Sequence, residues 1–184
     1  MALRETDRVY EELLLTLLQA GDPRAAARLV ARWQPRLLRT ARPLLRDEDE
    51  AHEATQEAWA GITRGWLRIG DSSRFPAWAF GVLHHKCADR IRANRRRRTG
   101  AGQLAVTAPA TAAPRIDDRI AIAQALDVLS PEHREAAILY FGEGLTAPEI
   151  AQATGVAAET VKSRIFHARR QLQAALTGDV HDKP

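Results

Sequence analysis

Apolar residues recur every three or four positions along most of this chain, and no segment shows the convincing apolar–polar alternation of a half-buried strand. This spacing is typical of amphipathic helices that bury one face. It predicts helices over about residues 6–19, 23–45, 51–66, 75–98 and 116–129, a helix that opens at Ser130, and two further helices after residue 145. We therefore expect an all-α fold.

Local signals mark several helix ends. Asp22 followed by Pro23 is typical of a helix start, and the serines of the Gly70–Arg74 loop are expected to cap the helix that follows them. Pro35 and Pro43 fall inside the second helix and predict kinks or breaks there.

The helix that opens at Ser130 begins with a capping serine and a first-turn proline, Pro131. Its apolar spacing predicts that Ala137, Ile138 and Phe141 are buried. Two glycines then separate it from the next segment, so we expect it to end there.

A helix-turn-helix pattern follows in the last third of the chain. Thr146 and Glu149 stand at the spacing of a capping box, and Pro148 is tolerated in the first turn between them. Gly155 supplies the sharp turn to a second helix. Ala157 stands where a polar cap is expected, at a cost of roughly 0.5–2 kcal/mol, so this second helix must rely on packing.

The second helix of this motif has one apolar face and a basic polar surface. Val161, Ile165 and Ala168 share a face and are expected to point inward. The polar positions carry residue types that read DNA grooves and bind phosphates, namely Thr160, Lys162, Ser163, Arg164, His167 and Arg170. A solvated amphipathic helix would explain the charges alone, but capping, turn and basic surface together favour DNA binding.

Charge is unevenly distributed along the 184 residues, although the formal net charge is only +4. Acidic residues gather between Asp47 and Glu57, and basic residues gather between Lys86 and Arg98. A basic cluster of this kind indicates a polyanionic partner or a solvated helix end. The acidic cluster is more typical of a docking face for a basic partner than of paired catalytic carboxylates.

Composition also predicts the domain organisation. Residues 99–114 are small, neutral and interrupted by Gly and Pro, which favours a flexible linker. We therefore predict helical domains at residues 1–98 and 115–177, with a frayed tail at 178–184. The single cysteine excludes an intrachain disulfide, and no signal-peptide pattern or membrane-length apolar run is recognised, so we expect a cytoplasmic protein.

The helix over residues 75–98 interleaves aromatic and cationic residues, as sites for unpaired nucleic-acid bases do. For Trp78 a core position is the favoured alternative. His84, His85 and Cys87 suggest a metal- or redox-sensing site, but a structural zinc site needs four ligands and no second pair is present. We expect no metal, no cofactor and no enzymatic activity, because no nucleophile–base arrangement is recognised.

Together these motifs resemble the extracytoplasmic-function (group IV) bacterial RNA polymerase sigma factors. The resemblance rests on Gly21–Pro23, on Gln56-Glu57 with Trp59 and Trp66, on Phe75–Trp78 with Asp89–Arg92, and on Val161–Arg169. In this order and spacing the motifs cover nearly the whole chain. A stand-alone helix-turn-helix regulator is the alternative, but it leaves the first domain without a role.

The resemblance implies the partners and the site residues. Core RNA polymerase would be bound through its largest-subunit coiled coil and its flap, with Glu53, Gln56, Glu57 and Trp59 as contacts. The minus-ten element, as melted single strand, would be bound by Ser72, Arg74, Trp78, His85, Lys86 and Arg90, with His85 standing where the family usually has Asn. Duplex minus-thirty-five DNA would be read by the six polar residues of the second helix-turn-helix helix. An anti-sigma factor is a further implied partner.

Overall fold

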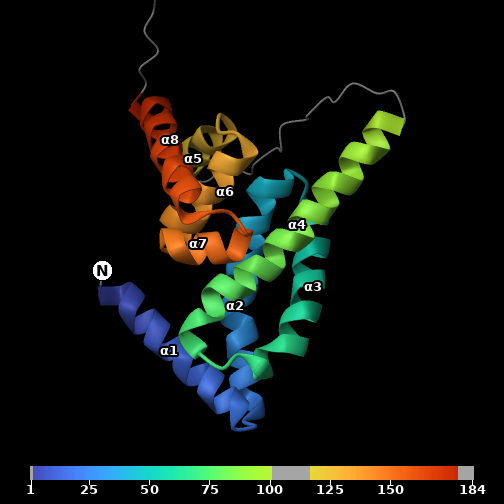
Figure 1. Cartoon of the computed structure of the whole chain (residues 1–184), viewed down its shortest axis with the longest axis vertical. Coiled ribbons are helices and arrows are strands. Elements are labelled where there is room, and N and C mark those ends of the chain that lie inside the picture. The colour runs from blue at the N-terminus through green and yellow to red at the C-terminus, as the bar shows by residue number, and fades with distance from the viewer. Residues whose placement is uncertain (1, 101–116, 178–184) are drawn as a thin grey trace, which may run out of the picture.

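The computed structural model describes residues 2–100 and 117–177 (Figure 1). The elements in chain order are α1 (Ala2–Gln19), α2 (Pro23–Leu45), α3 (Glu48–Gly65), η1 (Trp66–Arg68), η2 (Ser72–Arg74), α4 (Phe75–Gly100), α5 (Asp117–Asp127), α6 (Pro131–Ala137), η3 (Ile138–Gly142), α7 (Ala147–Thr154) and α8 (Ala158–Thr177). Every regular element within these two ranges is helical, which confirms the predicted all-α fold.

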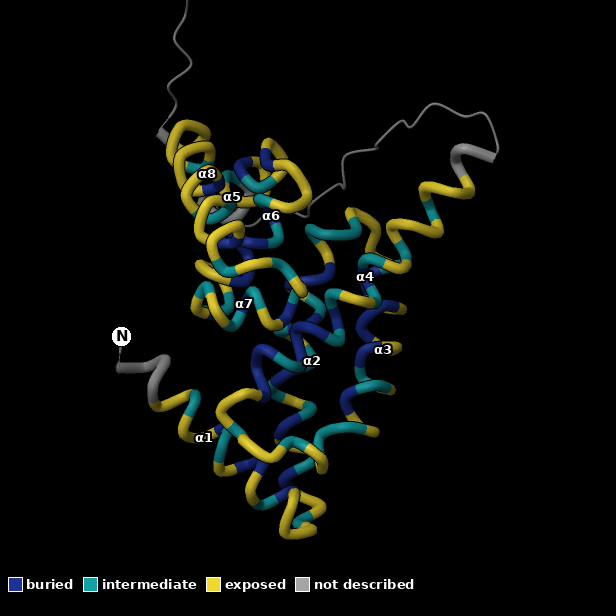
Figure 2. Tube along the Cα trace, in the orientation of Figure 1, coloured by how far each residue is buried: buried dark blue, intermediate teal, exposed yellow. Residues whose placement is uncertain are grey.

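The first half of the chain packs α1 to α4 around aromatic residues. Trp33, Phe75 and Phe80 are each at most 1% exposed. The Trp33 ring lies 4.9 Å from the Phe75 ring in an edge-to-face arrangement, and 5.3 Å from the Phe80 ring. Figure 2 shows the buried residues running along the inner face of α2, between its neighbours. Such aromatic contacts fix the start of α4 against α2.

The helix α2 is continuous, so the predicted proline breaks are wrong. Pro35 and Pro43 both lie inside it. Each interior proline costs about 3 kcal/mol in helix stability, but the buried face that includes Trp33 and Leu37 holds the helix together. At its start the Asp22 side chain accepts a hydrogen bond from the Arg24 backbone amide, as predicted.

The loop serines are predicted to cap the helix from Phe75, but Ser72 and Ser73 form the short helix η2, which Asp71 caps. Asp71 accepts hydrogen bonds from the Ser73 backbone amide at 3.0 Å and from the Ser73 hydroxyl at 2.7 Å. A carboxylate accepts two donors at once, whereas a serine hydroxyl is the weaker acceptor here. The short helix η2 thus leads into α4.

The predicted linker and tail fall mostly beyond what the structure describes. The helix α4 continues to Gly100, past its predicted end at residue 98. The rest of the linker, up to residue 114, and the predicted tail at 178–184 lie outside the described residues.

In the second half Ser130 accepts a hydrogen bond from the His133 backbone amide and starts α6, as predicted. Ala137 and Ile138 are buried as expected, but Phe141 is 41% exposed and its predicted burial is wrong. The chain winds into a wider π-helical turn over Ile138–Gly142, and this extra residue per turn moves Phe141 off the buried face.

The two halves lie against each other and share one core. Leu139, Leu145 and Ile150 of the second half belong to the same buried cluster as the residues of α1 to α4. The helix α7 lies beside the middle of α4 (Figure 1). At this crossing a Cβ on Gly81 would lie 3.2 Å from the carbonyl oxygen of Ala153, so the missing side chain permits a close approach.

Candidate nucleic-acid interface

The helix-turn-helix starts with the predicted capping box. The Thr146 backbone amide donates to Glu149 at 2.6 Å, and the Glu149 amide donates to the Thr146 hydroxyl at 3.4 Å. Arg8 of α1 also donates to both Glu149 oxygens, at 3.0 and 3.2 Å. Partial burial opposes ionisation of Glu149, but the Thr146 and Arg8 hydrogen bonds outweigh it and lower its pKa. At the turn Gly155 has a φ of 71°, which favours glycine.

The helix α8 has the predicted division of faces. Val161 and Ala168 are at most 1% exposed, and Ile165 is half-buried. Of the six candidate minus-thirty-five residues, Arg164 is half-buried and the others, Thr160, Lys162, Ser163, His167 and Arg170, are exposed. The polar face of α8 is therefore open to a ligand.

Two of these candidates have neighbours that orient them. Lys162 donates to Glu159 one turn earlier at 2.7 Å. The His167 ring stacks on the ring of His133 from α6, with 5.7 Å between centroids. Both contacts leave the polar face exposed, and the stack ties the middle of α8 to α6.

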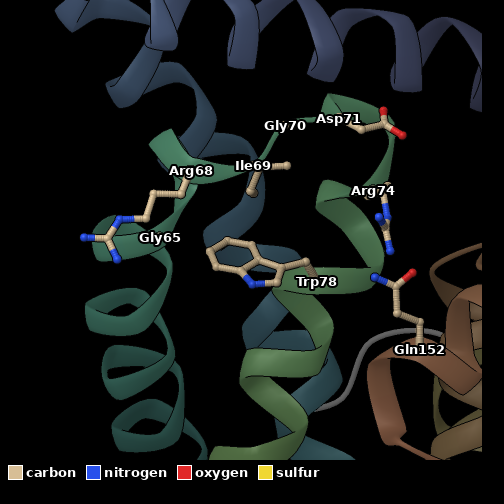
Figure 3. A pocket seen from close by; sticks show the side chains of 8 residues that line it. All are labelled: Gly65, Arg68, Ile69, Gly70, Asp71, Arg74, Trp78 and Gln152. Carbon is tan, nitrogen blue, oxygen red and sulfur yellow. The ribbon is translucent and has the colours of Figure 1, made fainter.

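A second candidate surface is a pocket between the end of α3 and the start of α4 (Figure 3). It has a volume of about 590 Å³ and opens to solvent. Its lining residues are Gly65, Arg68, Ile69, Gly70, Asp71, Arg74, Trp78 and Gln152. The Trp78 indole faces the cavity from α4, and two arginines lie on either side of it (Figure 3). A pocket of this size can hold a single base.

Gly65 gives Trp78 its place in the pocket. A Cβ on Gly65 would lie 2.6 Å from Cζ2 of the Trp78 ring, closer than atoms tolerate. The ring also lies 6.0 Å from that of Phe75. Trp78 is therefore neither fully buried nor free to turn, and one part of its indole is available for stacking.

The pocket loop is held from two sides. Asp71 binds Ser73 within the loop, and these hydrogen bonds lower the pKa of its carboxyl. The Gln19 side chain of α1 donates to the Ile69 carbonyl oxygen at 2.8 Å. Because contacts within the loop and from α1 both fix it, the pocket is largely formed before any ligand arrives.

The structure separates the candidate minus-ten residues into two groups. Arg74 and Trp78 line the pocket, and Ser72 starts the adjoining η2. His85, Lys86 and Arg90 lie farther along α4 and do not line it. His85 is exposed and its Nδ1 lies 2.6 Å from the Gly81 carbonyl oxygen.

Arg90 is held by the acidic face of α3. Its guanidinium donates to Glu50, Glu53 and Glu57 at 2.6, 2.7 and 2.6 Å. Partial burial disfavours the charged guanidinium, but these hydrogen bonds outweigh it and raise the pKa of Arg90. Its hydrogen bond to Glu57 lowers the pKa of that carboxyl. Arg90 therefore fixes α3 to α4 in this state.

The candidate polymerase contacts lie along one side of α3. Glu53, Gln56 and Glu57 are exposed, although Arg90 engages both glutamates. Trp59 is half-buried and donates its indole N–H to Gln34 of α2. The three polar residues therefore form an exposed strip, and Trp59 anchors it to α2.

The candidate metal ligands have other partners. His84 lies 2.5 Å from Glu135 of α6, and this hydrogen bond raises its pKa. Cys87 is 2% exposed, and burial raises the pKa of its thiol to about 12. Among residues 2–100 and 117–177 no three His, Cys, Asp or Glu side chains gather as a metal site would require. In the same ranges no helix combines the length and apolarity needed to cross a bilayer.

Sequence reasoning missed four pocket residues: Gly65, Arg68, Ile69 and Gln152. Arg68 could have been found as a cation beside the Gly70–Arg74 loop. Gln152 carries no sequence signal, because it reaches the pocket only through the packing of α7 on α4.

Comparisons with known proteins agree on one family. Residues 29–97 match Sigma-70 region 2, and residues 119–172 match Sigma-70, region 4. The ECF RNA polymerase sigma factor SigM of Mycobacterium tuberculosis H37Rv is 31% identical over 163 residues, which cover 89% of this chain and 83% of SigM. SigL of the same strain is 33% identical over 148 residues, covering 76% of this chain and 82% of SigL.

A solved structure is also similar over most of its length. The sigma factor RpoE from Bartonella quintana, crystallised with the anti-sigma factor NepR, matches with a TM-score of 0.73 and 25% identity. The match covers 83% of this chain and 97% of RpoE.

Proposed function

This chain belongs to the ECF RNA polymerase sigma factors, alternative sigma factors that direct transcription initiation, and we propose that its two halves divide promoter recognition between a pocket and a helix. The observation that carries the proposal is the presence of two different exposed surfaces whose side chains suit nucleic acid. One is the open pocket beside Trp78, and the other is the exposed polar face of α8.

The pocket suits one unpaired base of the melted minus-ten strand. An aromatic ring offers a stacking surface to any base, and cations beside it follow the phosphates. Trp78 supplies the ring, while Arg68 and Arg74 supply the cations. The carboxylate of Asp71 and the backbone around Gly70 line the same cavity and provide hydrogen-bond acceptors for base edges. Ser72, His85 and Lys86 remain candidates for the adjoining strand.

The helix α8 is suited to the major groove of the minus-thirty-five duplex. In helix-turn-helix proteins the second helix enters the groove while the first crosses the phosphate backbone. Arg164 offers donors of the kind that read guanine, Lys162 offers a charge that can bind phosphate, and Thr160, Ser163, His167 and Arg170 surround them.

The exposed strip of α3 is the proposed contact with core RNA polymerase. Arg90 gathers Glu50, Glu53 and Glu57 into one acidic group, which a basic surface on the polymerase can share. In this proposal Arg90 acts on DNA only indirectly, because three carboxylates already neutralise its charge.

The remaining proposals concern partners and place of action. We propose an anti-sigma factor as a partner, since the similar RpoE was crystallised with one. The chain is proposed to act by binding and not by catalysis, as its relatives are transcription factors. Its place of action is the cytoplasm, where bacterial polymerase meets promoter DNA.

In vitro transcription tests this function. Bacterial core RNA polymerase is incubated with a promoter library, with and without the purified chain. Chain-dependent initiation at a defined subset of promoters is the expected result. Tight binding of the chain alone to a specific duplex, with no initiation and no binding to core polymerase, would instead identify a stand-alone regulator. The control is duplex binding at several salt concentrations, because non-specific binding falls steeply with salt.

A further inference from the structure

One large apolar side chain is exposed beside the pocket. Leu67 of η1 is 59% exposed. Across residues 14–90, all of which the structure describes, it is the only large apolar residue that is exposed and not buried or half-buried. A single exposed leucine is common on protein surfaces and implies nothing by itself. The position of Leu67 is informative, because the four residues that follow it, 68–71, all line the pocket.

The short helix η1 directs Leu67 away from the core. In a 3₁₀ helix, side chains three positions apart share a face. Trp66 and Ile69 therefore share one, and both pack against the buried cluster. Leu67 and Arg68 occupy the two other sides of this turn, and both are exposed. Arg68 and Ile69 point in different directions in Figure 3. Leu67 thus projects into solvent next to a residue that lines the pocket.

The backbone on either side of Leu67 is fixed. Before it, the Trp66 amide donates to the Ile62 carbonyl oxygen and continues the hydrogen bonding of α3. After it, the Ile69 carbonyl oxygen accepts a hydrogen bond from Gln19 of α1 at 2.8 Å. A side chain on a fixed backbone can stay between two bases without being displaced by them.

Capture of a base in the pocket leaves a gap in the DNA strand. A base that leaves the stack loses its contacts with its neighbours, and closing of the strand restores them. Proteins that kink or unstack DNA insert apolar side chains, leucine among them, between the separated base steps. Leu67 has the required chemistry, and the adjacent Arg68 offers a cation for the neighbouring phosphate.

We propose that Leu67 is a wedge that enters the gap left by the base held beside Trp78 and so keeps the minus-ten strand open. The proposal rests on the base-binding pocket proposed above. In this division of work the pocket selects the base that leaves the stack, whereas Leu67 prevents its neighbours from closing. Loss of the Leu67 side chain slows opening of a duplex but does not impair use of a strand that is already open.

Strand opening by the polymerase holoenzyme tests the wedge. A promoter selected from the library carries, in its minus-ten element, a fluorescent adenine analogue that brightens when it unstacks. A second template has mismatched bases there and is already open. Leu67→Ala should slow opening of the duplex by about tenfold, because the gap is no longer filled. On the open template it should initiate as the unaltered chain does. Leu67→Met keeps an apolar side chain of similar length and should restore opening.

Leu13→Ala is the matched control. Leu13 is also an exposed leucine, at 51%, but it lies on α1 and does not line the pocket. This variant should use both templates as the unaltered chain does. Fluorescence anisotropy measures the affinity of each variant for core polymerase, which the Leu67 and Leu13 substitutions should leave unchanged. Thermal unfolding should also be unchanged in Leu67→Ala, since an exposed side chain contributes little to stability.

Three results would overturn the wedge while the promoter function stands. The first is duplex opening by Leu67→Ala as fast as by Leu13→Ala. The second is an equal loss on the duplex and on the open template, which would indicate a role in binding and not in opening. The third is weaker binding of Leu67→Ala to core polymerase, which would make Leu67 a polymerase contact. If the unaltered chain initiates on neither template, the promoter function fails and the wedge fails with it.

Discussion

Arg36 shows how one side chain can join three parts of this protein. Its guanidinium lies 4.1 Å from the ring centroid of buried Trp33, and it donates both to Glu11 of α1 and to Glu143. Planar stacking and a forked set of donors are properties that lysine lacks. Arg36 therefore couples the first helix, the aromatic core and the second half, and it shares Glu11 with Arg32 and Glu143 with Arg39.

The contact between His84 of α4 and Glu135 of α6 is expected to make the packing of the two halves sensitive to pH. Its pKa is raised by the Glu135 hydrogen bond, and Arg92 and Arg164 oppose this from α4 and α8. A raised pKa means that its stabilisation is full below the unfolded value of about 6.5 and is lost as pH rises through the folded value. His84→Gln should cost about 1 kcal/mol of unfolding free energy near pH 6 and less at higher pH.

Urea denaturation of the unaltered chain and of His84→Gln across this range measures the effect. His85→Gln is the matched control, because His85 is exposed and bonds only within its own helix. Parallel pH curves for the unaltered chain and His84→Gln would contradict the prediction.

Gly65 is expected to affect recognition of the minus-ten element, because its missing side chain leaves room for the Trp78 ring. Gly65→Ala places a methyl group against the Trp78 ring and should displace it, at a cost of about 1–3 kcal/mol in stability. The selectivity of initiation among minus-ten variants should fall as the stacking surface moves. Transcription from a minus-ten library measures this.

Gly70→Ala is the control for Gly65→Ala. Gly70 lines the same pocket, but a Cβ there would meet nothing within 4 Å. Equal losses of selectivity in the two variants would show that Trp78 placement is not the cause.

At the scale of elements, Arg90 and three carboxylates form the most heavily bonded polar contact between α3 and α4, beside the weaker pairs of Lys86 with Glu57 and Arg97 with Glu50. Arg90→Ala removes the charge that holds Glu50, Glu53 and Glu57 together, and these would then repel one another. We expect a loss of about 2 kcal/mol in unfolding free energy, since the glutamates are partly exposed and solvent relieves some repulsion. Urea denaturation at neutral pH is the measurement.

The control for Arg90→Ala is Arg92→Ala, whose exposed guanidinium binds Asp89 one turn away on the same helix. It should cost no more than about 0.5 kcal/mol. Similar losses in both variants would mean that Arg90 has no special part in joining the helices.

The recognition helix α8 permits a test of base reading. Arg164→Ala should cost roughly 1–3 kcal/mol in promoter binding if its guanidinium pairs with a base edge, and should relax selectivity at one minus-thirty-five position. Lys162→Ala is the comparison. A lysine that binds only phosphate strengthens binding to every DNA sequence by the same amount, so its removal should weaken binding to all minus-thirty-five variants equally. Initiation across minus-thirty-five variants gives both profiles, and unchanged selectivity in Arg164→Ala would refute the assignment.

The elements could be predicted where their signals are local. The Thr146 capping box and the Asp22 cap depend on residues two or three positions apart, so the sequence reveals them. Phe141 was misplaced because a π-helical turn shifts the face on which it lies. The role of Gly65 depends on where another helix places an indole, and no spacing along the chain records that.

At the scale of the whole molecule, the sequence predicts two helical halves but does not predict that they pack together around one core. Leu145 and Ile150 lie in the segment predicted as a separate small domain, yet they belong to the same buried cluster as Trp33. Apolar periodicity identifies which face is buried but not what covers it. Acidic and basic residues that face each other across the halves, such as Glu143 and Arg39, stand more than a hundred positions apart.

The position of Arg36 between two carboxylates leaves it a partner if the two halves separate. Without Glu143, Arg36 would retain Glu11, and the largely exposed Arg39 would be taken up by water. Separation of the halves would therefore strand no buried cation, and the charged contact could form again when they meet. An equilibrium between two such forms would respond in proportion to the difference in a ligand's affinity for them.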